Sequence, residues 1–301
     1  MARTVVVTGA GSGIGRAIAA RFAADGAQVF ITGRTETTIR RTAEELDEDT
    51  PGNVVGVVCD STDPKRLRAL VSRLGRRVDV LVNASGGLVP AESAAAWGVD
   101  EDGSGQAHGN AHGVGVGDGV GDGGGQRVAD GVADGGEPSG GGEPGPVIEP
   151  EEDPLESLKQ IWNAYVAQNV LGAVLTTAAV RDLLGPGSSV VSLGSIGAER
   201  RGGAYGAAKA ALAAWSAGLS AELGPRGVTV NVVAPGYIEG TGFFLGAMSD
   251  ARHELLVGET YDGRAGTPED VAELVFFLAS PGARHLTGQT VHLNGGAFTT
   301  R

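Results

Sequence analysis

The sequence predicts an α/β fold built on a doubly wound parallel sheet, and two features of the chain lead to this prediction. Short apolar runs alternate with amphipathic segments along most of the 301 residues. The apolar runs contain few polar positions, which is typical of parallel strands that are covered on both faces. Because crossovers between parallel strands are right-handed, helices are expected on both sides of one sheet.

The predicted elements follow one another in regular order. Strands are expected at residues 5–8, 28–32, 54–59, 78–83, 188–193, 228–233 and 290–293, each a short apolar run. Helices are expected at residues 14–24, 36–46, 64–74, 155–184, 204–223 and 268–278, where apolar residues recur at helical spacing. This strict alternation is what favours a parallel sheet over an antiparallel one.

Residues 98–146 interrupt the alternation. Nineteen of these 49 residues are glycine, and none is aromatic, leucine or isoleucine. Glycine loses more backbone entropy on ordering than any other residue, and this segment has little apolar surface to offset that loss. We therefore expect a disordered insertion, with residues 1–97 and 147–301 forming a single domain of 252 residues.

Two metal-binding interpretations of the insertion are weaker. Asp118 and Asp122 follow glycines, as in calcium-binding repeats, but the nonapeptide period of those repeats is missing. His108 and His112 are spaced like two ligands on a helix, yet a glycine-rich segment does not favour a helix. No metal site is predicted.

The charge and composition of the chain argue against several classes of partner. The formal net charge is −13, of which the insertion supplies −8. No basic surface for nucleic acid, no lipid-binding patch and no apolar run long enough to span a membrane is visible. Cys59 is the single cysteine, which suits a reducing compartment, and no signal peptide is recognisable, so a cytoplasmic protein is expected.

A glycine-rich turn joins the first predicted strand to the first predicted helix. It reads TGAGSGIG from residue 8 to residue 15, where Gly9, Gly13 and Gly15 allow the backbone to turn tightly and approach a pyrophosphate. Ser12 and Ile14 belong to the same turn. The helix that follows offers free N–H groups and positive potential to phosphates, so the turn predicts a dinucleotide site.

The ends of the next three strands carry residues suited to the same ligand. Arg34 follows the second strand, where an acidic residue would bind the adenosine ribose and an arginine instead pairs with a 2′-phosphate. NADP(H) is therefore favoured as the cofactor, and NAD(H) stays possible. Asp60 and Ser61 follow the third strand near the expected adenine, and Asn83 and Ala84 close the fourth.

One tyrosine and one lysine share a predicted helix face. Tyr205 and Lys209 are four residues apart in the stretch AYGAAK, and the chain has only 4 tyrosines and 3 lysines. Side chains at this spacing are neighbours on a helix. An ammonium group favours the ionised form of a nearby phenol, so the pair is either a chance packing contact or a tyrosine of lowered pKa that exchanges protons near neutral pH.

Taken together, these motifs resemble the short-chain dehydrogenase/reductase family. The resemblance rests on TGAGSGIG, NASG, YGAAK, NVVAPGYI and LTGQTVHLNGG in this order, and it spans the chain outside residues 98–146. It implies a Rossmann-like three-layer sandwich that binds NAD(P). It further implies that Tyr205 is the general acid or base and that Lys209 is its partner and a ligand of the nicotinamide ribose. Ser195 then donates a hydrogen bond to the substrate, and Asn169 holds a relay water.

The resemblance also implies further cofactor contacts and has some departures. The implied contacts are Pro235, Gly236, Ile238 and Thr241. Ser195 lies closer to Tyr205 than is usual in the family, whereas Ser192 has the more usual spacing but falls within a predicted strand. Ala84 stands where many relatives carry a second asparagine. Residues 242–266 correspond to the family's substrate-binding loop, and their apolar side chains predict an apolar pocket wall.

Two functions are compatible with the sequence. The first is an NADPH-dependent reductase of ketones, or the reverse dehydrogenation of secondary alcohols, with a carrier-bound acyl chain among the candidate substrates. The second is a cofactor-binding sensor or scaffold whose acidic insertion recruits a partner. In the family, the helices that correspond to residues 155–184 and 204–223 form subunit interfaces, so a homodimer or homotetramer is expected.

Overall fold

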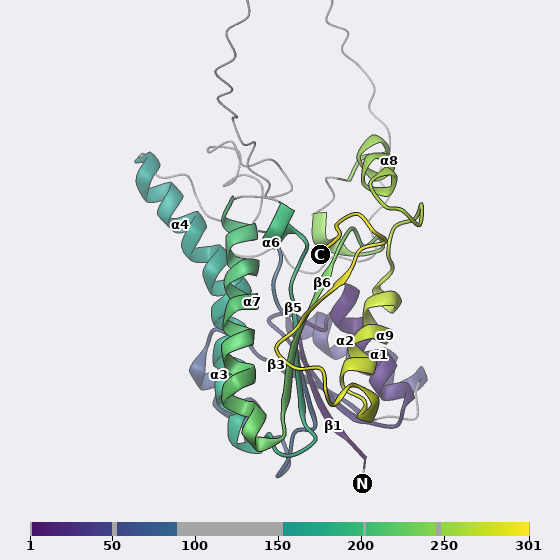
Figure 1. Cartoon of the computed structure of the whole chain (residues 1–301). Helices are drawn as coiled ribbons and strands as arrows, with labels where there is room; N and C mark the ends of the chain where they lie inside the picture. The colour runs from purple at the N-terminus through teal and green to yellow at the C-terminus, as the bar shows by residue number, and fades with distance from the viewer. Residues whose placement is uncertain (1, 50–52, 89–152, 201–202, 245–247, 301) are drawn as a thin grey trace, which may run out of the picture.

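A computed structural model shows seven parallel strands in one sheet (Figure 1). It describes residues 2–49, 53–88, 153–200, 203–244 and 248–300. The strands are β1 (Thr4–Thr8), β2 (Gln28–Gly33), β3 (Asn53–Val58), β4 (Val80–Asn83), β5 (Ser189–Leu193), β6 (Thr229–Pro235) and β7 (Thr290–Leu293). Their order is β3-β2-β1-β4-β5-β6-β7, and each neighbouring pair is parallel. The predicted doubly wound sheet is confirmed, and every strand lies within two residues of its predicted position.

Helices cover both faces of this sheet, as Figure 1 shows. On one face lie α1 (Gly13–Ala24), α2 (Glu36–Asp49) and α9 (Pro268–Leu278), and on the other lie α3 (Pro64–Val71), α5 (Gly172–Val180) and α7 (Gly203–Leu223). Successive side chains of a strand point to opposite faces. Val5 and Val7 accordingly belong to the first core and Val6 to the second. Burial on both faces explains why the strands are apolar nearly throughout.

The helix predicted at residues 155–184 is interrupted. It begins as α4 (Pro154–Val166), where Asp153 caps the first turn by accepting a hydrogen bond from the backbone N–H of Leu155. It then passes through a π-helical segment (Ala167–Leu171) into α5, and a 3₁₀ turn ends it. A π-helical turn takes up one extra residue and is often found at functional sites. The segment contains Asn169, one of the predicted site residues.

The segment at residues 242–266 contains more regular structure than a loop. A 3₁₀ turn (Gly242–Phe244) is followed by α8 (Asp250–Gly258), which Ser249 caps by accepting a hydrogen bond from the backbone N–H of Arg252. A second short helix, α6 (Gly197–Arg200), precedes α7. In Figure 1, α6 and α8 both lie beyond the carboxyl ends of the strands. They therefore stand at the edge of the sheet where a ligand site is expected.

The strand order reverses between β1 and β4. β1 pairs with β2 on one side and with β4 on the other, so the loops that follow β1 and β4 leave the sheet in opposite directions. Ligands of open parallel sheets bind in the crevice at this point. Within the described residues, no helix is long and apolar enough to cross a membrane. The insertion predicted at residues 98–146 lies outside the described residues.

Candidate active site

The glycine-rich turn after β1 packs tightly against the loop after β4. Gly9 has a φ of +63°, and a Cβ atom there would lie 2.8 Å from the Cα of Ser85. A Cβ atom at Gly15 would lie 2.4 Å from the carbonyl oxygen of Gly9. The Thr8 Oγ1 atom accepts hydrogen bonds from the backbone N–H groups of Ala84 and Ser85, both at 3.1 Å. The glycines are therefore needed for close approach of the backbone, and larger residues would disrupt the turn.

The N-terminus of α1 faces the crevice without a capping side chain. Ser12 is the N-cap residue and makes no side-chain capping hydrogen bond, and the first turn has no acidic residue. The first N–H groups of a helix lack partners within it and, together with the helix dipole, attract anions. Ser12 and Ile14 line the crevice, whereas Gly13 packs against Thr241. This end of the crevice thus suits a phosphate group.

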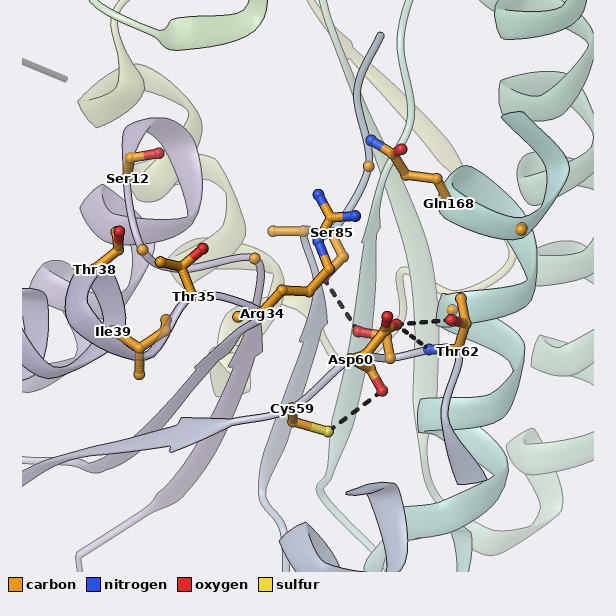
Figure 2. A pocket seen from close by; sticks show the side chains of 18 of the residues that line it. Ser12, Arg34, Thr35, Thr38, Ile39, Cys59, Asp60, Thr62, Ser85 and Gln168 are labelled. Carbon is orange, nitrogen blue, oxygen red and sulfur yellow. Dashed lines mark hydrogen bonds between the residues drawn. The ribbon is translucent and has the colours of Figure 1, made fainter. Parts of the chain in front are cut away.

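A groove of about 300 Å³, which we call the main groove, runs along the carboxyl ends of β1, β2 and β3. The π-helical segment and the end of α4 form its opposite wall, as Figure 2 shows. Arg34 is exposed and extends into the main groove from the end of β2. None of the ion pairs found among the described residues involves Arg34. The guanidinium group is therefore available for an anionic ligand.

Asp60 and Ser61 line the same groove at the end of β3. The Asp60 Oδ1 atom accepts hydrogen bonds from the backbone N–H of Thr62 at 2.8 Å and from its hydroxyl at 2.7 Å. Ser61 Oγ and Ser85 Oγ are 3.3 Å apart and share a hydrogen bond. These contacts fix the loops after β3 and β4 at the expected adenosine end of the groove.

Asn83 does not face the crevice, which corrects one predicted cofactor contact. It lies on the same side of β4 as Leu81, toward α5, because side chains alternate along a strand. Its amide nitrogen donates hydrogen bonds to Thr177 Oγ1 at 3.1 Å and Ser192 Oγ at 3.3 Å. Ser192 is likewise fully buried in this network. The side chains of Asn83 and Ser192 therefore hold β4, β5 and α5 together and do not reach a ligand.

Tyr205 and Lys209 lie on the same buried face of α7. Their side chains are 8% and 4% exposed, and the Lys209 Nζ atom lies 5.7 Å from the centre of the Tyr205 ring. Lys209 Nζ also donates a hydrogen bond of 2.9 Å to the carbonyl oxygen of Leu193 at the end of β5. Ser195 forms a hydrogen bond with the Tyr205 hydroxyl, and its Oγ atom accepts one from the backbone N–H of Gly197 at 3.0 Å. The structure thus brings three of the four predicted catalytic residues together.

The pKa of Tyr205 moves in the direction opposite to the predicted one. Burial raises the pKa of the phenol above its usual value, and the hydrogen bond with Ser195 acts in the lowering direction but is the smaller effect. Burial also lowers the pKa of Lys209 from 10.5 to about 8. Near neutral pH and without cofactor, Tyr205 is therefore a protonated phenol. It lies beside the Lys209 ammonium group, which loses its proton more readily than an ordinary lysine.

Asn169 acts on the loop after β4 through its side chain. Its Oδ1 atom accepts a hydrogen bond from the backbone N–H of Gly87 at 3.0 Å, and its Nδ2 atom donates to the carbonyl oxygens of Gly87 and Tyr165 at 3.1 and 3.2 Å. A Cβ atom at Gly86 would lie 2.7 Å from Asn169 Oδ1 and 3.1 Å from Lys209 Nζ. The side-chain amide of Asn169 thus clamps the Gly86–Gly87 backbone beside the lysine, and the relay water that the resemblance implies stays a prediction.

Two smaller cavities of about 120 and 90 Å³ continue from the main groove and share Tyr205 and Ser195 as walls. We call them together the inner cavity. Phe243 and Phe244 line both parts, and the Phe243 ring meets the Tyr205 ring edge-on with centres 5.6 Å apart. Tyr237 contacts Phe244 in the same way at 5.9 Å. The inner cavity is therefore largely apolar around the Tyr205 hydroxyl.

The short helices α6 and α8 close the far end of the inner cavity. Arg200 of α6 and Glu259, which follows α8, form an ion pair of 2.8 Å and both line the cavity. Leu256 also lines it, in agreement with the predicted apolar wall, but Leu255 is 65% exposed and points away. Leu245, another residue of the predicted wall, lies outside the described residues.

Most of the predicted cofactor contacts lie along one continuous path. The main groove and the inner cavity together are lined by Gly9, Ser12, Ile14, Arg34, Asp60, Ser61, Ala84, Lys209, Pro235, Gly236, Ile238 and Thr241. Gly11, Gly86 and Gln168 also line this path and have no counterpart among the predicted residues. Gly86 could have been found from the glycine pair that follows β4, whereas nothing in the sequence marks Gln168.

The chain matches known families on both sides of residues 101–146. Residues 3–100 match the family described as short chain dehydrogenase, and residues 147–298 match the one described as enoyl-(acyl carrier protein) reductase. A protein of Mycobacterium tuberculosis H37Rv that is named only as an oxidoreductase is 31% identical over 300 residues, covering 98% of this chain and 97% of its own length. The chain belongs to the short-chain dehydrogenase/reductase family. It is thus an NAD(P)-dependent oxidoreductase, as the motifs predict.

Other members of the short-chain dehydrogenase/reductase family align over nearly the whole chain. The 3-oxoacyl-(acyl-carrier-protein) reductase of Escherichia coli is 28% identical over 299 residues, covering 98% of this chain and 97% of its own. A short-chain dehydrogenase of Burkholderia cenocepacia J2315, solved in complex with NADP, is 26% identical with a TM-score of 0.66 and covers 98% and 97% of the two chains. A dehydrogenase/reductase of Sinorhizobium meliloti 1021 superposes with a TM-score of 0.70 at 26% identity, covering 99% and 96%.

Potential metal ligands do not gather in the part of the chain that the structure describes. No group of three or more histidine, cysteine, aspartate or glutamate side chains is close enough there to hold an ion. His108, His112, Asp118 and Asp122 fall outside the described residues.

Proposed function

We propose that the protein is an NADPH-dependent reductase of ketones and that Tyr205 gives the proton to the carbonyl oxygen. The observation that carries this proposal is the position of the Tyr205 hydroxyl, which lies with Ser195 and Lys209 where the main groove opens into an apolar inner cavity. A carbonyl group in the inner cavity would then have a proton donor on one side and the nicotinamide end of the groove on the other.

The main groove fits a dinucleotide with a 2′-phosphate. The close contact of Gly9 with Ser85 leaves backbone, rather than side chains, at the pyrophosphate position, and the uncapped N-terminus of α1 faces it. Arg34 supplies a bidentate cation at the end of β2, where a 2′-phosphate would lie. The relative from Burkholderia cenocepacia was solved with NADP. When bound, the cofactor would supply the hydride, and NADH would be a weaker alternative.

The residues of the chain have complementary tasks in this reduction. The raised pKa of Tyr205 keeps the phenol protonated near neutral pH, which suits a proton donor. The hydrogen bond that Ser195 Oγ accepts from Gly197 holds it beside Tyr205, and its hydroxyl can turn from Tyr205 to donate to the substrate oxygen on which negative charge develops. The Lys209 ammonium, held by the Leu193 carbonyl, stabilises the phenolate that remains after the transfer. The protonated state of Tyr205 favours reduction over alcohol oxidation.

The substrate that fits best carries its carbonyl group between apolar substituents. Phe243, Phe244 and Leu256 form the walls, and the charged pair of Arg200 and Glu259 stands at the far end. The similarity to a 3-oxoacyl-(acyl-carrier-protein) reductase supports a carrier-bound acyl chain as one such substrate.

Replacement of Tyr205 by phenylalanine tests the proposal. We expect Tyr205→Phe to bind NADPH normally but to reduce ketones about 100- to 10,000-fold more slowly, because general acid catalysis contributes about that much. Tyr165→Phe is the matched control, since this second buried tyrosine packs against the Tyr205 ring at 6.2 Å. The measurement is the loss of reduced-cofactor absorbance over a panel of acyl-thioester, alicyclic and aryl ketones. Equal turnover by Tyr205→Phe and the parent would contradict the proposal.

We further propose that the protein assembles as a homodimer or homotetramer through α4 and α7. Leu155, Trp162 and Val166 are spaced along one face of α4 and are 72%, 42% and 45% exposed. The exposed positions of α7 include Ala207, Ala210, Ala211, Ala214 and Ala217. Large apolar side chains beside a face of small ones would allow two copies to pack closely.

A further inference from the structure

The side-chain amide of Gln168 has no hydrogen-bond partner among the described residues, although part of it is buried. Its Oε1 atom is excluded from solvent. The neighbouring Asn169, in the same π-helical segment, makes three hydrogen bonds with its amide. Leaving a buried acceptor unpaired costs free energy, so native proteins rarely do so unless a ligand or water completes the site.

Gln168 is the polar part of one wall of the main groove. The residues of α4, the π-helical segment and α5 that line the groove are Ala164, Ala167, Gln168 and Gly172. Figure 2 shows the Gln168 amide extending from the helix toward the loop after β4. A Cβ atom at Gly87 would lie 3.6 Å from its Nε2 atom. The amide therefore lies at the edge of the main groove, beside the loop after β4.

The chemistry of an amide selects one part of a dinucleotide. The phosphates already face the N-terminus of α1 and Arg34, which are better suited to anions. A ribose hydroxyl both donates and accepts hydrogen bonds, so it can satisfy either end of a carboxamide. We propose that Gln168 is a further cofactor-binding residue whose amide pairs with a ribose hydroxyl of the bound dinucleotide. This inference rests on the proposed function.

Two substitutions of Gln168 test the inference through cofactor affinity. Gln168→Leu and Gln168→Met remove the amide but keep an apolar side chain of similar size. Each should weaken NADPH binding about five-fold, the change expected from the loss of one neutral hydrogen bond. Both should be at least as heat-stable as the parent without cofactor, since an unpaired buried acceptor has been removed. Asn163→Leu, at an exposed position of α4, is the control and should bind NADPH like the parent.

Fluorescence titration with NADPH and with its two halves identifies which ribose is bound. Reduced nicotinamide mononucleotide carries only the nicotinamide ribose, and 2′-phospho-AMP carries only the adenosine ribose. The half for which both variants have a lower affinity than the parent contains the hydroxyl that Gln168 binds. Unchanged affinity of both variants for NADPH, or for both halves, would overturn the inference. Failure of the parent protein to bind NADPH would instead contradict the proposed function.

Discussion

Lys209 and Tyr205 show how burial decides the chemistry of the site. The sequence places them one helical turn apart, and the structure confirms that both side chains lie on the same buried face. What the spacing could not predict is the amount of water each group loses. That loss depends on residues distant in the sequence, such as Phe243 and Leu193, which pack around the pair. The pKa of the phenol is therefore raised where the pairing alone predicts a lowered value.

The lowered pKa of Lys209 predicts a specific pH dependence. As the pH rises through about 8, Lys209 loses its proton and with it the positive charge that stabilises the phenolate of Tyr205. The pKa of Tyr205 is raised, so the phenol remains protonated over the same range. We expect kcat/KM for ketone reduction to be constant near neutral pH and to fall above about pH 8. A profile that stays level to about pH 10, the range of an ordinary lysine, would contradict this assignment.

Asn83 illustrates a second limit of prediction at the scale of residues. A polar residue at the carboxyl end of a central strand is a natural candidate for a ligand contact. The alternation of side chains instead places it toward α5, where it donates to Thr177 and Ser192. A difference of one position along β4 decides between the crevice and the core, and a strand that is apolar on both faces does not mark which face each residue takes.

The loop after β4 and the π-helical segment act as one unit at the scale of elements. Asn169 holds both backbone groups of Gly87, and Gly86 lies between Asn169 and Lys209. The sequence predicts a continuous helix here because its apolar periodicity continues past Val166. A π-helical turn depends on where one extra residue is taken up, and this is decided by contacts such as the Asn169 clamp. The strands, by contrast, were predictable because their burial on both faces leaves a clear apolar signature.

Gly86→Ala tests this unit. A Cβ atom would lie 2.7 Å from Asn169 Oδ1 on a backbone with a φ of +145°, which side chains rarely adopt. We expect a loss of about 1–3 kcal/mol in the free energy of unfolding. Because Lys209 is displaced as well, kcat/KM should fall at least about ten-fold.

The matched control for this substitution is Gly75→Ala, where a Cβ atom meets nothing within 4 Å. Thermal melting and steady-state kinetics of both variants check the prediction. If Gly86→Ala retained the stability and activity of the control, the loop after β4 would not have the positioning role assigned to it.

The whole molecule is one doubly wound domain to which residues 98–146 add most of the negative charge. The two family matches end at residue 100 and begin at residue 147, on either side of this segment. Its role and its disorder stay predictions, as does a cytoplasmic location. The fold and the family were predictable from the sequence because the strands and the glycine-rich turn are local patterns. The subunit contacts that the resemblance implies stay a prediction, because they depend on which helix faces remain exposed after folding.

Trp162→Glu tests the proposed subunit interface. A charge in the centre of an apolar contact would remain unpaired and desolvated, so we expect the variant to be monomeric. Leu255→Glu introduces the same charge at an exposed apolar position of α8 and should leave the assembly unchanged. Light scattering coupled to size-exclusion chromatography measures the mass of each. A monomeric parent, or a Trp162→Glu variant of unchanged mass, would contradict the interface.

The most direct test of the proposed chemistry follows the hydride from NADPH into the product and asks whether its transfer needs the Tyr205 hydroxyl. NADPH deuterated at the transferring position is mixed with the protein and a ketone, and deuterium in the product alcohol is measured by mass spectrometry. The parent protein should place the deuterium on the former carbonyl carbon. Tyr205→Phe should bind NADPH equally well but transfer deuterium at least about 100-fold more slowly. Equally fast transfer by Tyr205→Phe, or no transfer by the parent to any ketone of the panel, would contradict the role of Tyr205 as proton donor in ketone reduction.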